Sequence, residues 1–261
     1  MTRVLTALLL VPVVLAAVIW APVWLLALLL ALVAVLAARE FYGLAEASGL
    51  QPYSGLGLAA AGALALCLSL PLPAGSVTAA LFAILLAVLV TALSQPDRMA
   101  AACGNAGATL LGALYPGLLL GALGAMLGFG FGRFWLIFLL LVVWLGDTAA
   151  LYGGRAFGRH PLAPRVSPKK TWEGAAASLL AALGVGLALA LWVAEPRLVP
   201  LALGLNLAAQ VGDLIESLFK RGAGVKDSSH LLPGHGGVLD RVDAMLFAAP
   251  VLWYYLAYLH R

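Results

Sequence analysis

Long apolar runs recur along the whole chain, and they constrain its fold more than any other feature. A helix of about 20 apolar residues spans the roughly 30 Å hydrocarbon core of a bilayer. The runs therefore predict an all-α, polytopic membrane protein with about nine transmembrane helices. Their approximate bounds are 4–20, 22–38, 56–71, 77–93, 107–127, 134–153, 174–194, 198–219 and 238–259.

The overall composition supports a membrane protein. Hydrophobic residues make up 64% of the 261 residues, and charged residues make up 10%, against about a quarter in soluble domains. The net charge of +4 is interpreted as membrane topology and lipid headgroup contact, so no nucleic-acid partner is expected. The first run follows a short basic start, and a signal peptide is its alternative interpretation. The chain is expected to form one integral-membrane domain, with N-terminal helices over about 1–130 and functional helices and loops over 131–261.

The distribution of basic residues predicts which side faces the cytoplasm. Lys and Arg concentrate in loops on the cytoplasmic side of membrane proteins. If the nine runs all cross, one side receives Arg133, Arg197 and Arg261, and the side of the N-terminus receives the other 12 of the 15 basic residues. These 12 are Arg3, Arg39, Arg98, Arg155, Arg159, Arg165, Lys169, Lys170, Lys220, Arg221, Lys226 and Arg241. The N-terminus is therefore predicted to be cytoplasmic, and the acidic residues favour the same face.

A polar block between the last two runs carries most of the chemistry. Residues 217–243, SLFKRGAGVKDSSHLLPGHGGVLDRVD, combine four cations with three aspartates and five glycines. Placing charged groups at the boundary of a bilayer costs free energy, so such a cluster indicates a functional site. The PGHGG segment lets the backbone approach a ligand closely, and its amides could bind an anion.

Carboxylates of neighbouring runs are predicted to converge at this face. Helical spacing places Asp213 on one stripe with Asn206, Gln210, Ser217 and Lys220, with Glu216 beside it. The stripe suggests a hydrated cleft that opens sideways to lipid. Asp240 and Asp243 share a face of the next run at i, i+3 spacing, and Asp147 lies in the sixth run. Crowded carboxylates repel unless a hard cation such as Mg2+ binds them; interhelical hydrogen bonds or ion pairs are the alternative.

A second polar block, residues 165–174 with the sequence RVSPKKTWEG, lies on the same predicted side. Ser167 or Thr171 is expected to cap the helix that follows, and Glu173 to complete its start. Lys169 and Lys170 are candidates for phosphate contacts, or for contacts to anionic lipids.

These motifs resemble those of one enzyme family. The first motif reads Ser217-Leu-Phe-Lys220-Arg221, four residues, Lys226-Asp227, and then Leu232-Pro-Gly-His235-Gly236-Gly237-Val-Leu-Asp240-Arg241-Val-Asp243. This pattern is similar to the complete signature of the phosphatidate cytidylyltransferases, or CDP-diacylglycerol synthases. Ser167-Pro-Lys-Lys-Thr-Trp-Glu-Gly174 resembles the family's second polar motif, and Asp147 through Arg159 resembles the segment before it. Residues 1–130 resemble the family mainly as a series of apolar spans.

The resemblance implies a reaction and its partners. CTP and phosphatidate would give CDP-diacylglycerol and pyrophosphate, with Mg2+ as cofactor and a monovalent cation as a possible second ion. It also implies a homodimer. The short chain without a long soluble extension favours a bacterial inner membrane over an organelle membrane, and the basic residues predict a site on the cytoplasmic side. The lipid phosphate is already an anion, so positioning and charge neutralisation would suffice for its attack on CTP.

The candidate residues fall into three sets. The catalytic set is Asp213, Lys220, Arg221, Lys226, Asp240, Arg241 and Asp243. The metal set is Asp213, Asp240, Asp243 and Asp147. The substrate-binding set is Ser167, Lys169, Lys170, Thr171, Glu173, Ser217, Asp227, His235, Gly236 and Gly237.

Two other functions remain open from the residues. Carboxylates within membrane helices and glycine-broken helices also mark transport sites, and another CTP-using enzyme, such as a polyprenol kinase, would need similar groups. Gly112, Gly117, Gly121 and Gly124 could support helix contacts in a dimer or internal packing. Cys67 and Cys103 are expected to be reduced packing residues.

Overall fold

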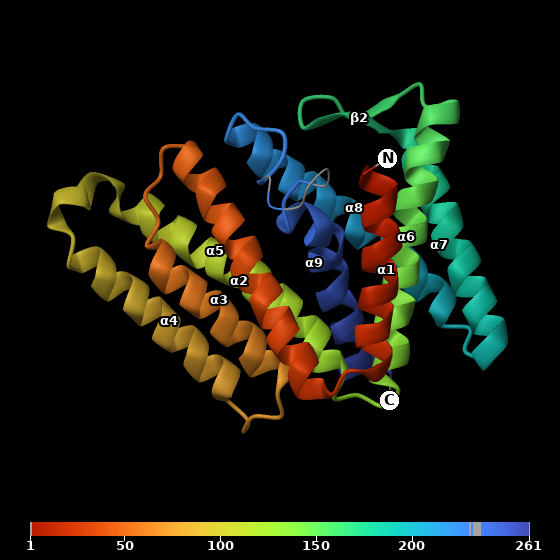
Figure 1. Ribbon diagram of the computed structural model, residues 1–261, viewed down its shortest axis with the longest axis horizontal. Helices are drawn as coiled ribbons and strands as arrows, with labels where there is room; N and C mark the ends of the chain where they lie inside the picture. The colour runs from red at the N-terminus through yellow and green to blue at the C-terminus, as the bar shows by residue number, and fades with distance from the viewer. Residues whose placement is uncertain (1, 230, 232–235, 261) are drawn as a thin grey trace. The chain divides into compact units, whose positions relative to one another are not determined.

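The computed structural model describes residues 2–229, 231 and 236–260, with side chains from residue 11 onward. Across this described part the chain forms nine α-helices, one short hairpin, and single 3-10 and π turns, η1 and η2 (Figure 1). The bounds are α1 Thr2–Trp20, α2 Val23–Ala47, α3 Ser54–Ser69, α4 Ser76–Leu93, η1 Pro96–Ala101, α5 Ala102–Met126, α6 Gly132–Phe157, β1 Pro161–Ala163, β2 Ser167–Thr171, α7 Trp172–Val193, α8 Leu198–Gly222, α9 Leu239–Tyr254 and η2 Tyr255–Leu259. The all-α prediction is confirmed.

Seven of the helical segments are long and apolar enough to cross a membrane, so the protein is an integral membrane protein. They are α2, α4, η1 with α5, α6, α7, α8, and α9 with η2. The prediction of about nine spans is met in part. Helix α3 has 16 residues and is about 24 Å long at 1.5 Å per residue, which is shorter than the hydrocarbon core. In the first predicted span, the apolar stretch with described side chains is Val11–Trp20.

Two compact units divide the chain. The first comprises residues 1–132 and 222–242, and the second comprises 133–221 and 243–261. The segment 222–242, which includes most of the polar block and the first turn of α9, therefore groups with the N-terminal helices.

In the first unit, α2, α3 and α5 pack against one another, and α4 packs against α3 and α5 (Figure 1). The glycines of α5 make this close packing possible. A Cβ atom on Gly117 would lie 2.8 Å from the Ala61 carbonyl oxygen, and one on Gly121 would lie 2.8 Å from the Leu68 side chain. Gly112 faces the Tyr42 ring, which is also buried. Of the two interpretations of these glycines, the structure shows internal packing.

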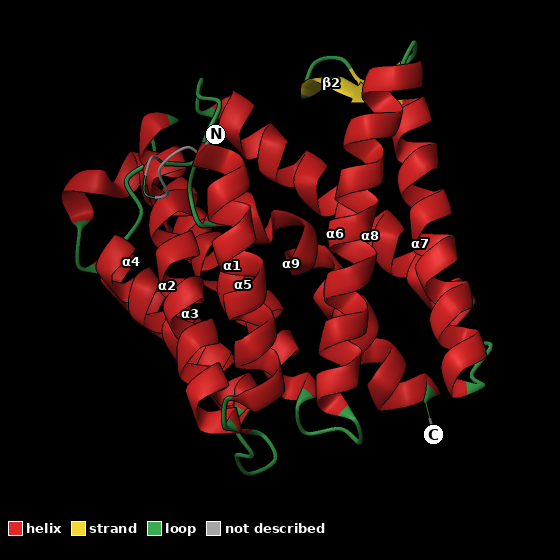
Figure 2. Cartoon of the chain, turned by 45° about the vertical axis from the view of Figure 1, so that its right-hand side comes forward, coloured by secondary structure: helices red, strands yellow, loops and turns green. Residues whose placement is uncertain are grey.

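In the second unit, the hairpin joins α6 to α7 at one end of the helices (Figure 2). Strands β1 and β2 are antiparallel, with Pro161 opposite Thr171. The Thr171 hydroxyl accepts a hydrogen bond from the Gly174 amide, so Thr171 caps α7 as predicted. Glu173 lies in the first turn of α7, at the helix start as predicted, but it does not form a capping box with Thr171. Its carboxylate instead accepts from the Arg159 and His160 amides at 3.1 and 3.3 Å, because it lies one position too early for a capping box.

A polar network holds α7 and α8 together. The Asn206 amide donates to the Ser178 hydroxyl at 2.9 Å, and the Gln210 amide donates to the Asn206 side-chain oxygen at 2.7 Å. Asn206 and Ser178 are 2% and 1% exposed. Gly146 of α6 faces the same amide, where a side chain would collide with it. The predicted hydrated cleft is therefore wrong for Asn206, which lies in buried interhelical packing.

Candidate metal and substrate site

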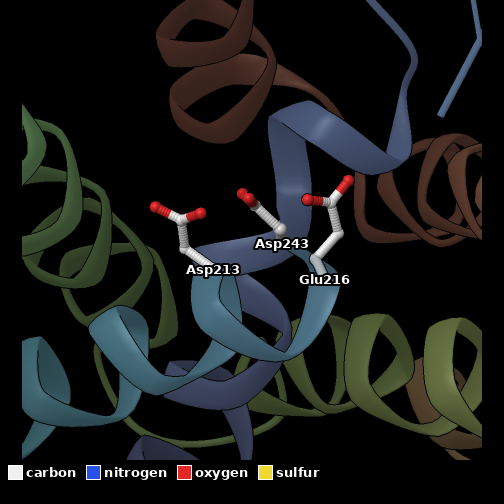
Figure 3. Close-up of side chains that lie close together, drawn as sticks. All are labelled: Asp213, Glu216 and Asp243. Atoms are coloured by element: carbon white, nitrogen blue, oxygen red, sulfur yellow. The ribbon is translucent and has the colours of Figure 1, made fainter. Parts of the chain in front are cut away.

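Three carboxylates meet where α8 packs against the start of α9. Asp213 and Glu216 are three residues apart on one face of α8, and Asp243 comes from α9. One oxygen of each lies within 4.8 Å of the others. Figure 3 shows all three side chains projecting toward the same side of the two helices. Sequence spacing predicted Asp213 and Asp243 for a metal site, and the structure brings them together.

Gly212 allows the two helices to approach closely enough for this cluster. A Cβ atom at this position would lie 2.6 Å from the Asp243 carbonyl oxygen and 3.1 Å from the Phe247 side chain. The residue that follows is Asp213, so its backbone is fixed one residue from the helix contact. The close approach of α8 and α9 therefore determines the separation of the carboxylates.

Lysines balance the negative charge of the cluster. Lys170 of β2 forms an ion pair with Asp213, and Lys220 forms an i, i+4 ion pair with Glu216. The Glu216 side chain is fully buried, and that of Lys220 is only 12% exposed. Carboxylates in a setting of low polarity are costly unless cations or hydrogen bonds compensate them. The hairpin thus contributes directly to the site through Lys170.

The donor set of the cluster fits Mg2+. This ion prefers hard oxygen ligands, and it commonly binds a few carboxylates together with water and phosphate oxygens. Asp213, Glu216 and Asp243 supply three carboxylates from two rigid helices. Glu216 was missing from the predicted metal set, although its spacing of three residues from Asp213 was a signal for it. Asp147, predicted as a ligand, is exposed on α6, and its metal role stays a prediction.

Asp240 organises the polar loop in the first unit. Its Oδ2 accepts hydrogen bonds from the Ser228 amide at 3.0 Å, the Ser228 hydroxyl at 2.8 Å and the Gly237 amide at 2.8 Å. These contacts join the two ends of the loop before α9. Asp240 also lies three residues before Asp243 on the same helix, and its metal role stays a prediction.

Backbone conformation and lack of space favour glycine at positions 236 and 237 of the loop. Gly236 has φ +79, a left-handed conformation that favours glycine. A side chain at Gly237 would collide with Ser228 and with the carboxylate of Glu40. Their predicted role in substrate binding stays a prediction, and His235 lies outside the described residues.

The remaining predicted residues differ in their surroundings. Arg221 donates from Nε to the Val166 carbonyl oxygen at 3.2 Å, which links the end of α8 to the hairpin. The Ser217 hydroxyl lies 3.5 Å from Asp213 Oδ1. Ser167 is half-buried in β2, and four residues are exposed: Lys169, Lys226, Asp227 and Arg241. Their substrate contacts stay predictions.

Helices of this length and hydropathy, with a buried carboxylate cluster and paired lysines, define an integral membrane protein with a candidate divalent-cation site. The chain belongs to the cytidylyltransferase family, whose model matches residues 1–259.

Individual relatives share about half of the chain. A protein of Brucella suis biovar 1 (strain 1330) is 52% identical over 126 residues, 47% of each chain. A protein of Haemophilus influenzae is 42% identical over 133 residues, 48% of this chain and 46% of the relative. One of Staphylococcus saprophyticus is 46% identical over 125 residues, 46% of this chain and 48% of the relative. All three are named phosphatidate cytidylyltransferase. The chain spans about half the length of the curated relatives it matches.

Proposed function

We propose that the protein transfers the cytidylyl group of CTP to phosphatidate, giving CDP-diacylglycerol and pyrophosphate. The observation that carries this proposal is the cluster of Asp213, Glu216 and Asp243, with Lys170 and Lys220 paired to it. A cluster of this charge suits a reaction that brings two phosphate-bearing substrates together. Family membership and the names of the relatives support the same reaction.

The reaction needs no nucleophile from the protein. An oxygen of the lipid phosphate forms a bond to the α-phosphorus of CTP. The bond from that phosphorus to the oxygen bridging to the β-phosphate breaks, and pyrophosphate leaves with the electron pair. Catalysis then rests on in-line alignment and on neutralisation of the crowded anionic oxygens.

The site residues divide this work. Mg2+ bound by Asp213, Glu216 and Asp243 would supply positive charge and orientation for phosphate oxygens. Lys170 and Lys220 stand beside the carboxylates and would add ammonium contacts to phosphate. Arg221 is linked to the hairpin and would orient a phosphate with its remaining donors.

Further assignments extend the proposal. We assign Lys226 and Arg241 to phosphate contacts, Asp240 and Asp147 to the metal site or its support, and Ser167, Lys169, Thr171, Glu173, Ser217, Asp227, His235, Gly236 and Gly237 to substrate binding. We also propose that a monovalent cation is the second ion and that the protein forms a homodimer.

The proposed site faces the cytoplasm of a bacterial inner membrane. Support comes from the basic residues, 12 of 15 of which fall on the side of the N-terminus if all nine predicted runs cross the bilayer. Lys170, Lys220 and Arg221 are among them. CTP would then be available to the site from the cytoplasm, and phosphatidate from the bilayer.

Doubly labelled CTP tests the reaction. Purified protein in phosphatidate vesicles should transfer α-phosphate label to the lipid and release γ-phosphate label as pyrophosphate. Transfer of γ-label to a lipid would indicate a kinase instead. The absence of turnover, with specific flux of an ion or metabolite in sealed vesicles, would favour a transporter.

A further inference from the structure

Glu40, near the end of α2, is a buried carboxylate that the predicted site did not include. It is 7% exposed. Its Oε1 accepts hydrogen bonds from the Ser229 hydroxyl at 2.7 Å and the Val238 amide at 2.8 Å. Its Oε2 accepts from the Ser228 hydroxyl and the Leu239 amide, both at 2.8 Å. One side chain of α2 thus binds both ends of the described loop before α9.

Two of these donors belong to the beginning of α9. The first amides of a helix have no acceptor within the helix, and the N-terminal end carries partial positive charge. Val238, which precedes α9, has no side-chain oxygen to cap them. The Glu40 carboxylate accepts from the Val238 and Leu239 amides and so caps the start of α9 from a different helix.

A hydroxyl links Glu40 to the aspartate of the motif. The Ser228 hydroxyl lies 2.8 Å from Glu40 Oε2 and 2.8 Å from Asp240 Oδ2. The same Asp240 oxygen accepts from the Gly237 amide. Gly237 has no room for a side chain because Ser228 and Glu40 lie against it. The glycine, the serine and the two carboxylates therefore form one packed unit.

We infer that Glu40 is a positioning residue for the proposed reaction. It holds the described loop residues 228–229 and 236–238 and fixes the first turn of α9, the helix that carries Asp240 and Asp243. Burial of a carboxylate is costly without hydrogen bonds, and the four donors offset this cost only in the observed loop conformation. Mutation of residues that orient metal-binding groups through hydrogen bonds commonly lowers metal affinity or activity by about 10- to 100-fold.

The first test is independent of activity. Glu40→Gln keeps the shape of the side chain but turns one acceptor oxygen into a donor. Amide hydrogen exchange of the full-length protein in detergent micelles, followed by mass spectrometry, reports on residues 236–240. We expect exchange there to become about tenfold faster or more in the variant. The matched control is Glu46→Gln, which removes an exposed carboxylate of the same helix that accepts a hydrogen bond from the Ser54 hydroxyl. Its exchange at 236–240 should equal that of the wild type.

The second test measures the function and rests on the proposed reaction. The Mg2+ concentration that gives half-maximal turnover should rise about tenfold in Glu40→Gln and stay unchanged in Glu46→Gln. Loss of folded protein alone would lower the maximal rate and leave this concentration unchanged. Wild-type exchange at 236–240 in Glu40→Gln, or an unchanged Mg2+ dependence, would overturn the inference. A wild-type protein without turnover would instead refute the proposed function and leave the exchange test to decide on Glu40.

A milder variant covers the case in which Glu40→Gln does not fold. Ser229→Ala removes one hydroxyl donor and leaves the carboxylate in place. It should accelerate exchange at 236–240 by about threefold, because one hydrogen bond to a charged group is removed and water compensates part of the loss. Exchange identical to wild type in a folded Ser229→Ala protein would contradict the inference.

Discussion

Lys170 of β2 forms an ion pair with Asp213 of α8. The two residues belong to separate polar motifs of the sequence, and the pair joins the motif of the hairpin to the carboxylate cluster. The hairpin is short, but its capped junction with α7 and the contact of Arg221 with Val166 hold it against the end of α8. The second polar motif therefore contacts the candidate metal cluster directly.

The two adjacent lysines of the hairpin should differ in their effect on activity. Lys170→Ala removes the cation paired with Asp213, and we expect kcat/KM for CTP to fall about 10- to 100-fold, as for other groups that support a metal site. Lys169→Ala removes an exposed lysine and should have a clearly smaller effect. Steady-state kinetics of both variants in the same vesicles checks this. Equal losses would indicate that the two lysines act only through surface charge.

Glu216 should contribute to metal affinity, although the predicted metal set did not include it. Glu216→Gln keeps the volume but removes the charge, and we expect the half-saturating Mg2+ concentration to rise about 10- to 100-fold. Mg2+ titration of initial rates measures this. Glu195→Gln, at the turn before α8, is the control because Glu195 accepts from the nearby Arg197 amide and lies outside the cluster. An unchanged Mg2+ dependence in Glu216→Gln would remove this residue from the metal site.

The ion pair within α8 predicts an effect on stability as well. Lys220→Met removes the ammonium group that forms an ion pair with the fully buried Glu216. A buried charge that loses its partner typically costs about 3–5 kcal/mol, so the detergent-solubilised protein should unfold at a distinctly lower temperature. The double variant Lys220→Met/Glu216→Gln should recover part of this loss, since no charge is left alone. A single variant that unfolds at the wild-type temperature would show that the pair is well solvated.

Two glycines of α5 should respond in opposite ways to the same substitution. Gly117→Ala places a methyl group 2.8 Å from the Ala61 carbonyl oxygen, and overpacking of this kind costs about 1–3 kcal/mol. Gly107→Ala meets nothing within 4 Å and should be neutral or stabilising by up to about 1 kcal/mol, because alanine favours the helix. Thermal unfolding in detergent compares them. Equal stability of both variants would contradict the close contact of α3 and α5.

The parts of the fold that the sequence predicted follow from local rules. Apolar length predicted the helices, and i, i+3 and i, i+4 spacing grouped Asp213 with its neighbours on α8. Pairing between helices has no comparable local signal. The Ser178–Asn206–Gln210 network shows this, because the spacing of Asn206 and Gln210 is the same for a cleft and for buried packing. The sequence likewise did not predict that Gly212 lies at a helix contact, which only its closeness to Asp243 in the structure shows.

Glu40 is the clearest case of a residue that the sequence could not indicate. It lies in an apolar helix far along the chain from its partners, and its four hydrogen-bond donors are serine hydroxyls and backbone amides. Backbone donors have no residue type that a sequence pattern can show. The only signal was a carboxylate close to an apolar run, which equally fits a charged residue at the membrane surface.

The most direct measurement of the central claim is the transfer of α-phosphate label from CTP to phosphatidate by metal-stripped protein, titrated with Mg2+, for the wild type and Asp243→Asn. The wild type should regain activity with Mg2+. Asp243→Asn should remain inactive, at least about 100-fold below the wild type because a carboxylate ligand is lost, while it still elutes as a folded membrane protein. Mg2+-dependent turnover at the wild-type level in Asp243→Asn would contradict the assignment of the cluster as the metal centre of the proposed reaction.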